Sequence, residues 1–211
     1  YHIDWVANAH ATLLAWWHST QDLDAVERWR QEAPSPITEG ATNHFSQCNV
    51  RNHARALTLL GRFDEACMLL EALEVHTQRL GLVTDANRNQ ICLAAAAWYA
   101  GREEHACQHM HQALSLASRT ALVGSFLRLG KPLGELLNRL LDSGTLDALE
   151  QARAERLLAL AGRQKDFGSA RRLMLDETVI ADIVARPDDP HFAAHSPGVA
   201  NPGADSCRAF Q

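Results

Sequence analysis

The chain has 211 residues, of which 46% are hydrophobic and 21% charged, an ordinary composition for a globular protein with a sizeable core. Its formal net charge of −5 argues against a nucleic-acid binder, which needs a surplus of basic residues to neutralise phosphates. No apolar run approaches the ~18 residues of a membrane span, so we expect no membrane partner. The chain begins at Tyr1 without a signal-peptide pattern, and we interpret it as a piece of a longer protein.

The cysteines are scattered along the chain and form no CxxC pair. Small buried thiols explain such a pattern better than disulfides or a zinc site. We therefore expect a reducing, cytoplasmic setting. The residues concerned are Cys48, Cys67, Cys92, Cys107 and Cys207.

The first elements in chain order are two predicted helices, residues 4–19 and 23–33. When Ala25 is set against Ala66 and Ala106, the spacings are 41 and 40 residues. This pair of helices therefore resembles a degenerate copy of the repeat described next, with Thr20 where the later copies have glycine. Pro34, Pro36 and Gly40 then forbid a continuous helix, so 34–42 is predicted to be a connector.

Two copies of one pattern follow. Residues 61–67 read GRFDEAC and residues 101–107 read GREEHAC, 40 residues apart. Each copy ends one apolar helical run and opens another, which predicts helices at 43–60, 62–80, 84–100 and 102–118. A period of 20–50 residues is typical of helical repeat arrays, whose units stack to form an extended concave surface. The predicted fold is all-α, with antiparallel helix hairpins stacked as a tetratricopeptide-like (TPR-like) superhelix.

The pattern is weaker beyond Thr120. We expect a short helix at 121–128, a leucine-rich helix ending near 142, a helix from 146 that ends at Gly162, and a short helix near 166–174. The predicted repeat domain therefore spans 1–185, with hairpins at about 4–33, 43–80, 84–118, 121–142 and 146–175. Residues 186–211 are rich in Pro, Gly and Ala and are predicted to be a linker or tail.

These runs resemble a known family. The stretches LLGRFDEACMLLEAL and LAAAAWYAGREEHACQHMHQALSLAS are similar to the helical-repeat domain of MalT-like regulators of the LuxR family, and SFLRLGKPLGELLNRLL corresponds to the family's closing segment. The resemblance is clear over about 43–142 and loose elsewhere. In the closing segment, Arg128-Leu129 replaces the acidic pair that is usual in the family, and Lys131 precedes Pro132.

The resemblance implies an effector sensor in a transcriptional regulator. The repeats would bind a small-molecule inducer or a regulatory protein, with self-association as a further property. ATP would bind a separate upstream module, because the phosphate-loop motif is missing here, so we expect no cofactor on these residues. DNA would be bound only through a C-terminal helix-turn-helix that is also missing. The alternative hypothesis is a TPR-type protein-interaction scaffold without a small-molecule ligand.

No catalytic motif is recognisable, so we do not expect an enzyme. In TPR-like arrays the first helix of each hairpin lines the concave groove, where Trp offers a stacking face and Arg a fork for an anion, as suits an anionic or ring-containing effector. The competing interpretation places the tryptophans, Trp16 among them, in the inter-helix core and leaves the arginines solvated. We interpret the histidines at 105, 109 and 111 as exposed, not as a zinc site. The predicted groove residues are His10, Trp17, Arg51, Asn52, Arg55, Arg88 and Trp98, with His18 and Ile91 beside them.

Overall fold

The computed structural model describes residues 3–117 and 122–174, with side chains from 6–117 and 122–162, and the chain divides after Gln164 into two units. The described ranges contain helices and no strand, so the all-α prediction is confirmed. None of these helices is long and apolar enough to cross a membrane. The helices are α1 (Ile3–Thr20), α2 (Leu23–Glu32), α3 (His44–Leu59), α4 (Phe63–Arg79), α5 (Val83–Tyr99), α6 (Glu103–Ala117), α7 (Gly124–Leu127), α8 (Lys131–Ser143) and α9 (Ala148–Met174).

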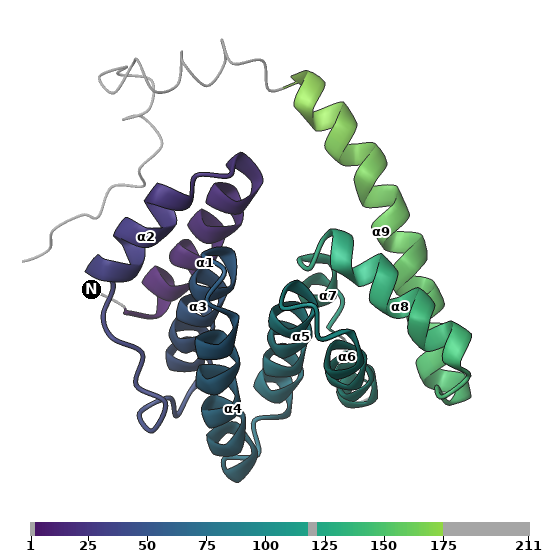
Figure 1. The fold of residues 1–211 in the computed structure, drawn as a ribbon, viewed down its shortest axis with the longest axis horizontal. Coiled ribbons are helices and arrows are strands. Elements are labelled where there is room, and N and C mark those ends of the chain that lie inside the picture. Colours follow the sequence, from purple (N-terminus) through teal and green to yellow (C-terminus); the bar gives the residue numbers. More distant parts are fainter. Residues whose placement is uncertain (1–2, 118–121, 175–211) are drawn as a thin grey trace, which may run out of the picture. The chain divides into compact units, whose positions relative to one another are not determined.

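The helices of the first unit pair in chain order and stack as hairpins (Figure 1). The first helices form one layer, because α3 packs against both α1 and α5, and α5 also contacts α7. The second helices fill the spaces behind this layer: α4 contacts α3 and α5, and α6 contacts α5 and α8. The predicted arrangement of stacked antiparallel hairpins is therefore confirmed.

The turns between successive helices share one hydrogen-bonding pattern. After α5, Gly101 has a φ of 73°, its N–H donates to Trp98 O at 3.0 Å, and the Arg102 N–H donates to Ala97 O at 2.9 Å. This pair of bonds is the Schellman motif, which closes a helix through a left-handed residue. The same bonds recur after α3 and α4, at Gly61 and Gly81. The turn therefore repeats every 20 residues, and the sequence comparison missed the copy at Gly81.

The first hairpin uses a residue other than glycine for this turn. Gln21 has a φ of 58°, and the Asp22 N–H donates to Trp17 O at 2.9 Å, as Arg62 does to Leu57 O. Gln21 is therefore the equivalent of Gly61, 40 residues earlier, and the assignment of Thr20 to that place is wrong by one residue. This corrected register sets Val26, not Ala25, against Ala66.

Substitution of Gly101 tests the turn. Gly101→Ala places a Cβ on a left-handed residue, and we expect the free energy of unfolding to fall by about 1–2 kcal/mol. Gly134→Ala is the matched control, because Gly134 lies inside α8 with no heavy atom within 4 Å of the added Cβ. There alanine is expected to stabilise the helix by about 0.5–1 kcal/mol. Urea denaturation measures both, and equal effects of the two changes would contradict this account of the turn.

The largest apolar cluster joins the third hairpin to α7, α8 and the start of α9. Phe126, Leu133 and Leu137 are fully buried there against Met110 and Leu114 of α6, and Ala154 and Leu157 of α9 complete the cluster. The closing segment is therefore part of the repeat core.

Two predictions for the C-terminal part differ from the structure. The helix expected at 121–128 is only the single turn α7, and the break expected at Gly162 is absent because α9 continues to Met174. A helical glycine costs about 1 kcal/mol relative to alanine but keeps its backbone hydrogen bonds, so it need not end a helix. The predicted tail 186–211 lies outside the described residues, and its boundary stays a prediction.

Candidate ligand-binding site

A cavity of about 190 Å³ opens on the layer of first helices. Its lining comes from α1, α3, α5 and α7, with Leu70 added from α4. The buried lining residues are apolar: Leu14, Ala54, Leu70, Ile91, Cys92 and Leu129. The polar lining residues are more exposed: His18, Arg55, Thr58, Tyr99, Ser125 and Arg128. The cavity thus combines an apolar floor with a polar mouth, as ligand pockets usually do.

One repeat position contributes a lining residue from each hairpin. With the 40-residue period of the turns, Ala15, Arg55 and Ala95 are equivalent, and all three line the cavity. The half-buried Arg55 of the middle hairpin is therefore flanked at its own level by two alanines. These small neighbours leave space beside its side chain.

The cavity is positively charged. Its two full charges are the guanidinium groups of Arg55 and Arg128, and no Asp or Glu is among the described lining residues. Within the described part of the chain, neither guanidinium has an ion-pair or hydrogen-bond partner. Burial raises the pKa of Tyr99, so its phenol stays neutral at physiological pH.

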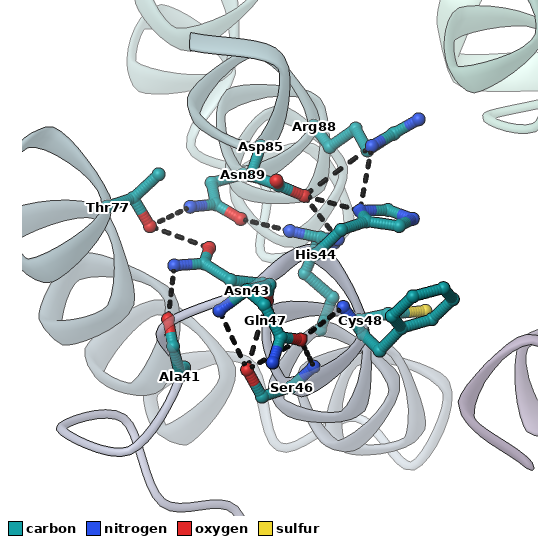
Figure 2. A network of polar contacts seen from close by, with 12 residues as sticks. Ala41, Asn43, His44, Ser46, Gln47, Cys48, Thr77, Asp85, Arg88 and Asn89 are labelled. Carbon is teal, nitrogen blue, oxygen red and sulfur yellow. Dashed lines mark hydrogen bonds and ion pairs between the residues drawn. The ribbon is translucent and has the colours of Figure 1, made fainter. Parts of the chain in front are cut away.

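A buried polar network lies closer than the cavity to the N-terminal ends of α3 and α5 (Figure 2). Arg51 is 2% exposed; its Nη2 donates to Asp85 Oδ1 at 2.9 Å and its Nη1 to Asn89 Oδ1 at 3.1 Å. His44 Nδ1 lies 2.8 Å from Asp85 Oδ1 and 3.0 Å from Arg88 Nη1. Burial lowers the pKa of Arg51, and the negative charge of Asp85 opposes that shift. Asp85 therefore compensates the buried positive charge.

The same network reaches α4. Asn89 Nδ2 donates to Thr77 Oγ1 at 3.0 Å and to Glu74 Oε2 at 3.1 Å. The Thr77 hydroxyl lies 2.7 Å from Gln47 Oε1, and Gln47 Nε2 donates to Ala41 O at 2.9 Å. Three helices and the connector before α3 are thereby joined through side chains that are almost completely buried. Such networks fix one packing arrangement when every member has a partner.

The residues predicted for the groove occupy three different environments. Arg55 lines the cavity, and Arg51 and Arg88 belong to the polar network. Asn52 is fully buried, and its Nδ2 donates to Ala7 O of α1 at 2.8 Å, which ties the first two hairpins together. The burial of Arg51 and Asn52 gives both a structural part in the packing, and ligand binding by the predicted set stays a prediction.

Of the predicted aromatic and histidine residues, His18 lines the cavity, while His10, Trp17 and Trp98 pack away from it. The imidazole of His10 meets the ring of Trp29 edge-on at 5.3 Å, and Trp17 packs against the core of the first hairpin. Trp98 is half-buried against the largest apolar cluster, with the Arg139 guanidinium 5.5 Å from its ring centre. For α1 the cause is the register error at Gln21, since one residue rotates a helix by about 100°. The residues of α1 that do line the cavity are Ala11, Leu14, Ala15 and His18.

Several lining residues were not in the predicted set. Arg128, Ser125 and Leu129 come from α7 and the turn after it, and Tyr99 ends α5. The signal for Arg128 was its departure from the acidic pair of the family pattern. The predicted hairpin at 121–142 placed a helix in this position of the layer, but a single turn carries no periodicity that assigns its residues to the cavity.

Of the histidines of α6, His105 is exposed as predicted, whereas His109 and His111 are half-buried and each lies near a polar side chain. His109 Nδ1 lies 2.8 Å from Gln90 Oε1, and His111 Nε2 lies 3.1 Å from Glu150 Oε2. Burial lowers the pKa of His109. Across the described residues, no group of three or more His, Cys, Asp or Glu is arranged to hold a metal ion.

Acid is expected to destabilise the first two hairpins through His10 and His53. Burial lowers the pKa of both imidazoles in the folded chain, from about 6.5 when unfolded. The unfolded chain therefore binds more protons in this range, and the stability from the neutral imidazoles is complete above pH ~6.5 and lost below it. We expect a lower unfolding free energy at pH 5.5 than at pH 7.5, and a smaller difference in His10→Phe. An unchanged pH dependence in that variant would contradict the role of His10.

The paired helices, the repeated turns and a layer of first helices that carries a cavity define a tetratricopeptide-type helical array. Comparison with protein families gives its place within that class. The family described as the MalT-like TPR region matches residues 1–143, and the chain belongs to this family.

Relatives of known name agree with this assignment. The chain is 36% identical over 197 residues to the HTH-type transcriptional regulator MalT of Klebsiella pneumoniae (strain 342). It is 37% identical over 200 residues to the protein of the same name from Vibrio cholerae serotype O1. In both comparisons the match covers 93% of this chain and 21% of the relative, so the chain spans about a fifth of the length of these regulators.

Proposed function

We propose that this chain is the effector-sensing region of a transcriptional regulator, and that the effector binds in the cavity lined by α1, α3, α5 and α7. The cavity itself carries the proposal, because it is a concave site with an apolar floor and polar mouth inside the MalT-like TPR region. DNA binding and ATP binding are then tasks of other parts of the regulator. The role of these residues is binding and not catalysis.

The positions of the lining residues explain how a ligand bound in this cavity would affect the whole helical array. Its four main helices belong to successive hairpins, so one ligand touches residues that are more than 100 positions apart, from Ala11 to Leu129. A ligand that binds one arrangement of these helices better than another shifts the population toward it. The polar network between α3, α4 and α5 adjoins the site and makes the middle hairpins a rigid support.

A protein partner is the second candidate, supported by exposed apolar residues on α1. Leu13 and Trp16 are 42% and 54% exposed, and their spacing of three residues makes them neighbours on the helix surface. Large exposed apolar groups that adjoin are typical of interaction surfaces. This surface would serve the scaffold function or self-association without using the cavity.

Thermal-shift screening against sugars, organic acids, fatty acids and aromatic metabolites tests the proposal. A ligand present at ~100 times its Kd should add about 2.7 kcal/mol to the unfolding free energy.

Ala95→Leu fills part of the cavity and should abolish the ligand-induced rise in melting temperature, while the same change at the exposed Ala72 of α4 should not. A shift that survives Ala95→Leu would contradict the assigned site. If no metabolite shifts the melting temperature, the scaffold hypothesis is tested by a pull-down of partner proteins, with Trp16→Ala as the control variant.

A further inference from the structure

We propose that the cavity recognises a small organic acid, with its anionic head group bound by Arg55 and Arg128 and an apolar body on the cavity floor. This inference rests on the proposed effector-sensing function and adds the chemical class of the ligand. It is carried by the charges of the lining, by the space around Arg55, and by the kinds of polar group present.

The arginines of the described chain differ in whether a carboxylate lies beside them. Arg51 of α3 and Arg88 of α5 both have Asp85 as a partner. Elsewhere in the described chain, Arg30, Arg62, Arg102 and Arg139 also pair with a carboxylate. Within the same part of the chain, Arg28 and Arg79 have no carboxylate partner either, but both are exposed and neither lines the cavity. Arg55 and Arg128 line one cavity, and within the described residues no acid faces either of them. In a chain with a net charge of −5, two uncompensated cations at one mouth indicate a site for an anion.

The position of the two arginines suits a shared head group. Arg55 lies on α3 between the alanines at its own repeat level, and Arg128 directly follows α7. An anion approached by both would link the second hairpin to the closing segment. Guanidinium is the side chain best suited to this task, because its planar fork donates two parallel hydrogen bonds to a carboxylate or phosphate.

The rest of the lining selects the body of the ligand. Leu14, Leu70, Ile91 and Leu129 are buried, so the floor offers apolar contact only. The hydroxyls of Thr58, Tyr99 and Ser125 can donate and accept hydrogen bonds, but no Asp, Glu, Asn or Gln is among the described lining residues, and the two arginines only donate. At about 190 Å³ the cavity is smaller than the ~300–1,000 Å³ of typical ligand pockets, so the body must be short.

The test uses matched ligands that differ in charge or in length. Isothermal titration of the full chain would compare hexanoate and hexyl phosphate with hexanamide, with butanoate and with the neutral disaccharide trehalose. We expect hexanoate or hexyl phosphate to bind at least about tenfold tighter than hexanamide, the range for one charged hydrogen bond. Butanoate should bind more weakly than hexanoate because it buries less apolar surface. The better of the two anions shows which head group the site prefers.

Variants then assign the head group to the two arginines. Arg55→Gln and Arg128→Gln should each weaken hexanoate binding about tenfold or more and leave hexanamide binding unchanged. Arg28→Gln is the matched control, because Arg28 is exposed on α2 and outside the cavity lining. Circular dichroism and the melting temperature show whether each variant is folded.

The outcomes separate this inference from the proposed function. Equal binding of hexanoate and hexanamide, or unchanged hexanoate binding in both arginine variants, would overturn the anion class. Trehalose or another neutral ligand that binds and is lost in Ala95→Leu would overturn it too, while the cavity would remain the effector site. If neither these ligands nor any screened metabolite binds, the inference and the proposed function fail together.

Discussion

An Asp85→Ala variant is expected to lose about 3–5 kcal/mol of unfolding free energy, the usual effect of removing one partner of a buried ion pair. Asp85 is 4% exposed and is the carboxylate that faces Arg51, Arg88 and His44. Its removal leaves the guanidinium of Arg51, itself 2% exposed, buried without a counter-charge. Guanidinium chloride denaturation followed by circular dichroism measures the change.

Two control variants show whether the loss comes from the unpaired charge. The double change Arg51→Met with Asp85→Leu removes both charges and should lose much less stability than Asp85→Ala alone, because no ion is left buried. Asp64→Ala breaks the pair with Arg102, whose side chains are 75% and 46% exposed, and should have no measurable effect. A double variant as unstable as Asp85→Ala would show that packing, not charge, dominates at this site.

Phe126→Ala is expected to lose about 3–5 kcal/mol as well, here by leaving a cavity in the core. Phe126 is fully buried in the largest apolar cluster and forms most of the anchor of the single-turn helix α7. Because α7 also contributes Ser125 and the adjoining Arg128 to the ligand cavity, the same change should weaken effector binding. Thermal denaturation and a binding titration of one preparation measure the two effects.

Leu127→Ala is the control for this prediction. Leu127 lies in the same helical turn but is only half-buried, so its truncation should lose less stability and leave binding nearly unchanged. If Phe126→Ala lowered stability without affecting the affinity of any effector, α7 would have no part in the binding site.

The sequence was sufficient to predict the hairpins, because their signals are local. A left-handed glycine closes each helix in the two clear copies, and small residues such as Ala54 and Ala66 recur where helices pack closely. The first hairpin was shifted by one residue because Gln21 takes the turn conformation without the glycine that would reveal it. That shift was enough to assign His10 and Trp17 to the groove and to leave out Ala11 and Ala15, whereas His18, predicted beside them, does line the cavity.

The candidate site was only partly predictable because its chemistry depends on contacts between hairpins. Arg51 and Arg55 are equally basic in the sequence and stand one helical turn apart. Only the fold reveals that Asp85, 34 residues after Arg51, pairs with Arg51, whereas Arg55 lines the cavity. Periodicity assigns residues to a face of a helix, but it does not identify which charge on the next helix lies opposite.

The measurement that tests the central claim most directly is hydrogen–deuterium exchange of the chain with and without the effector that gives the largest thermal shift. We expect added protection at residues 11–18, 54–59, 91–99 and 125–129, the segments that line the cavity, with little change in α2 and α6. Protection confined to α2 and α6, or to α1 alone, would contradict the assignment of this cavity as the effector site.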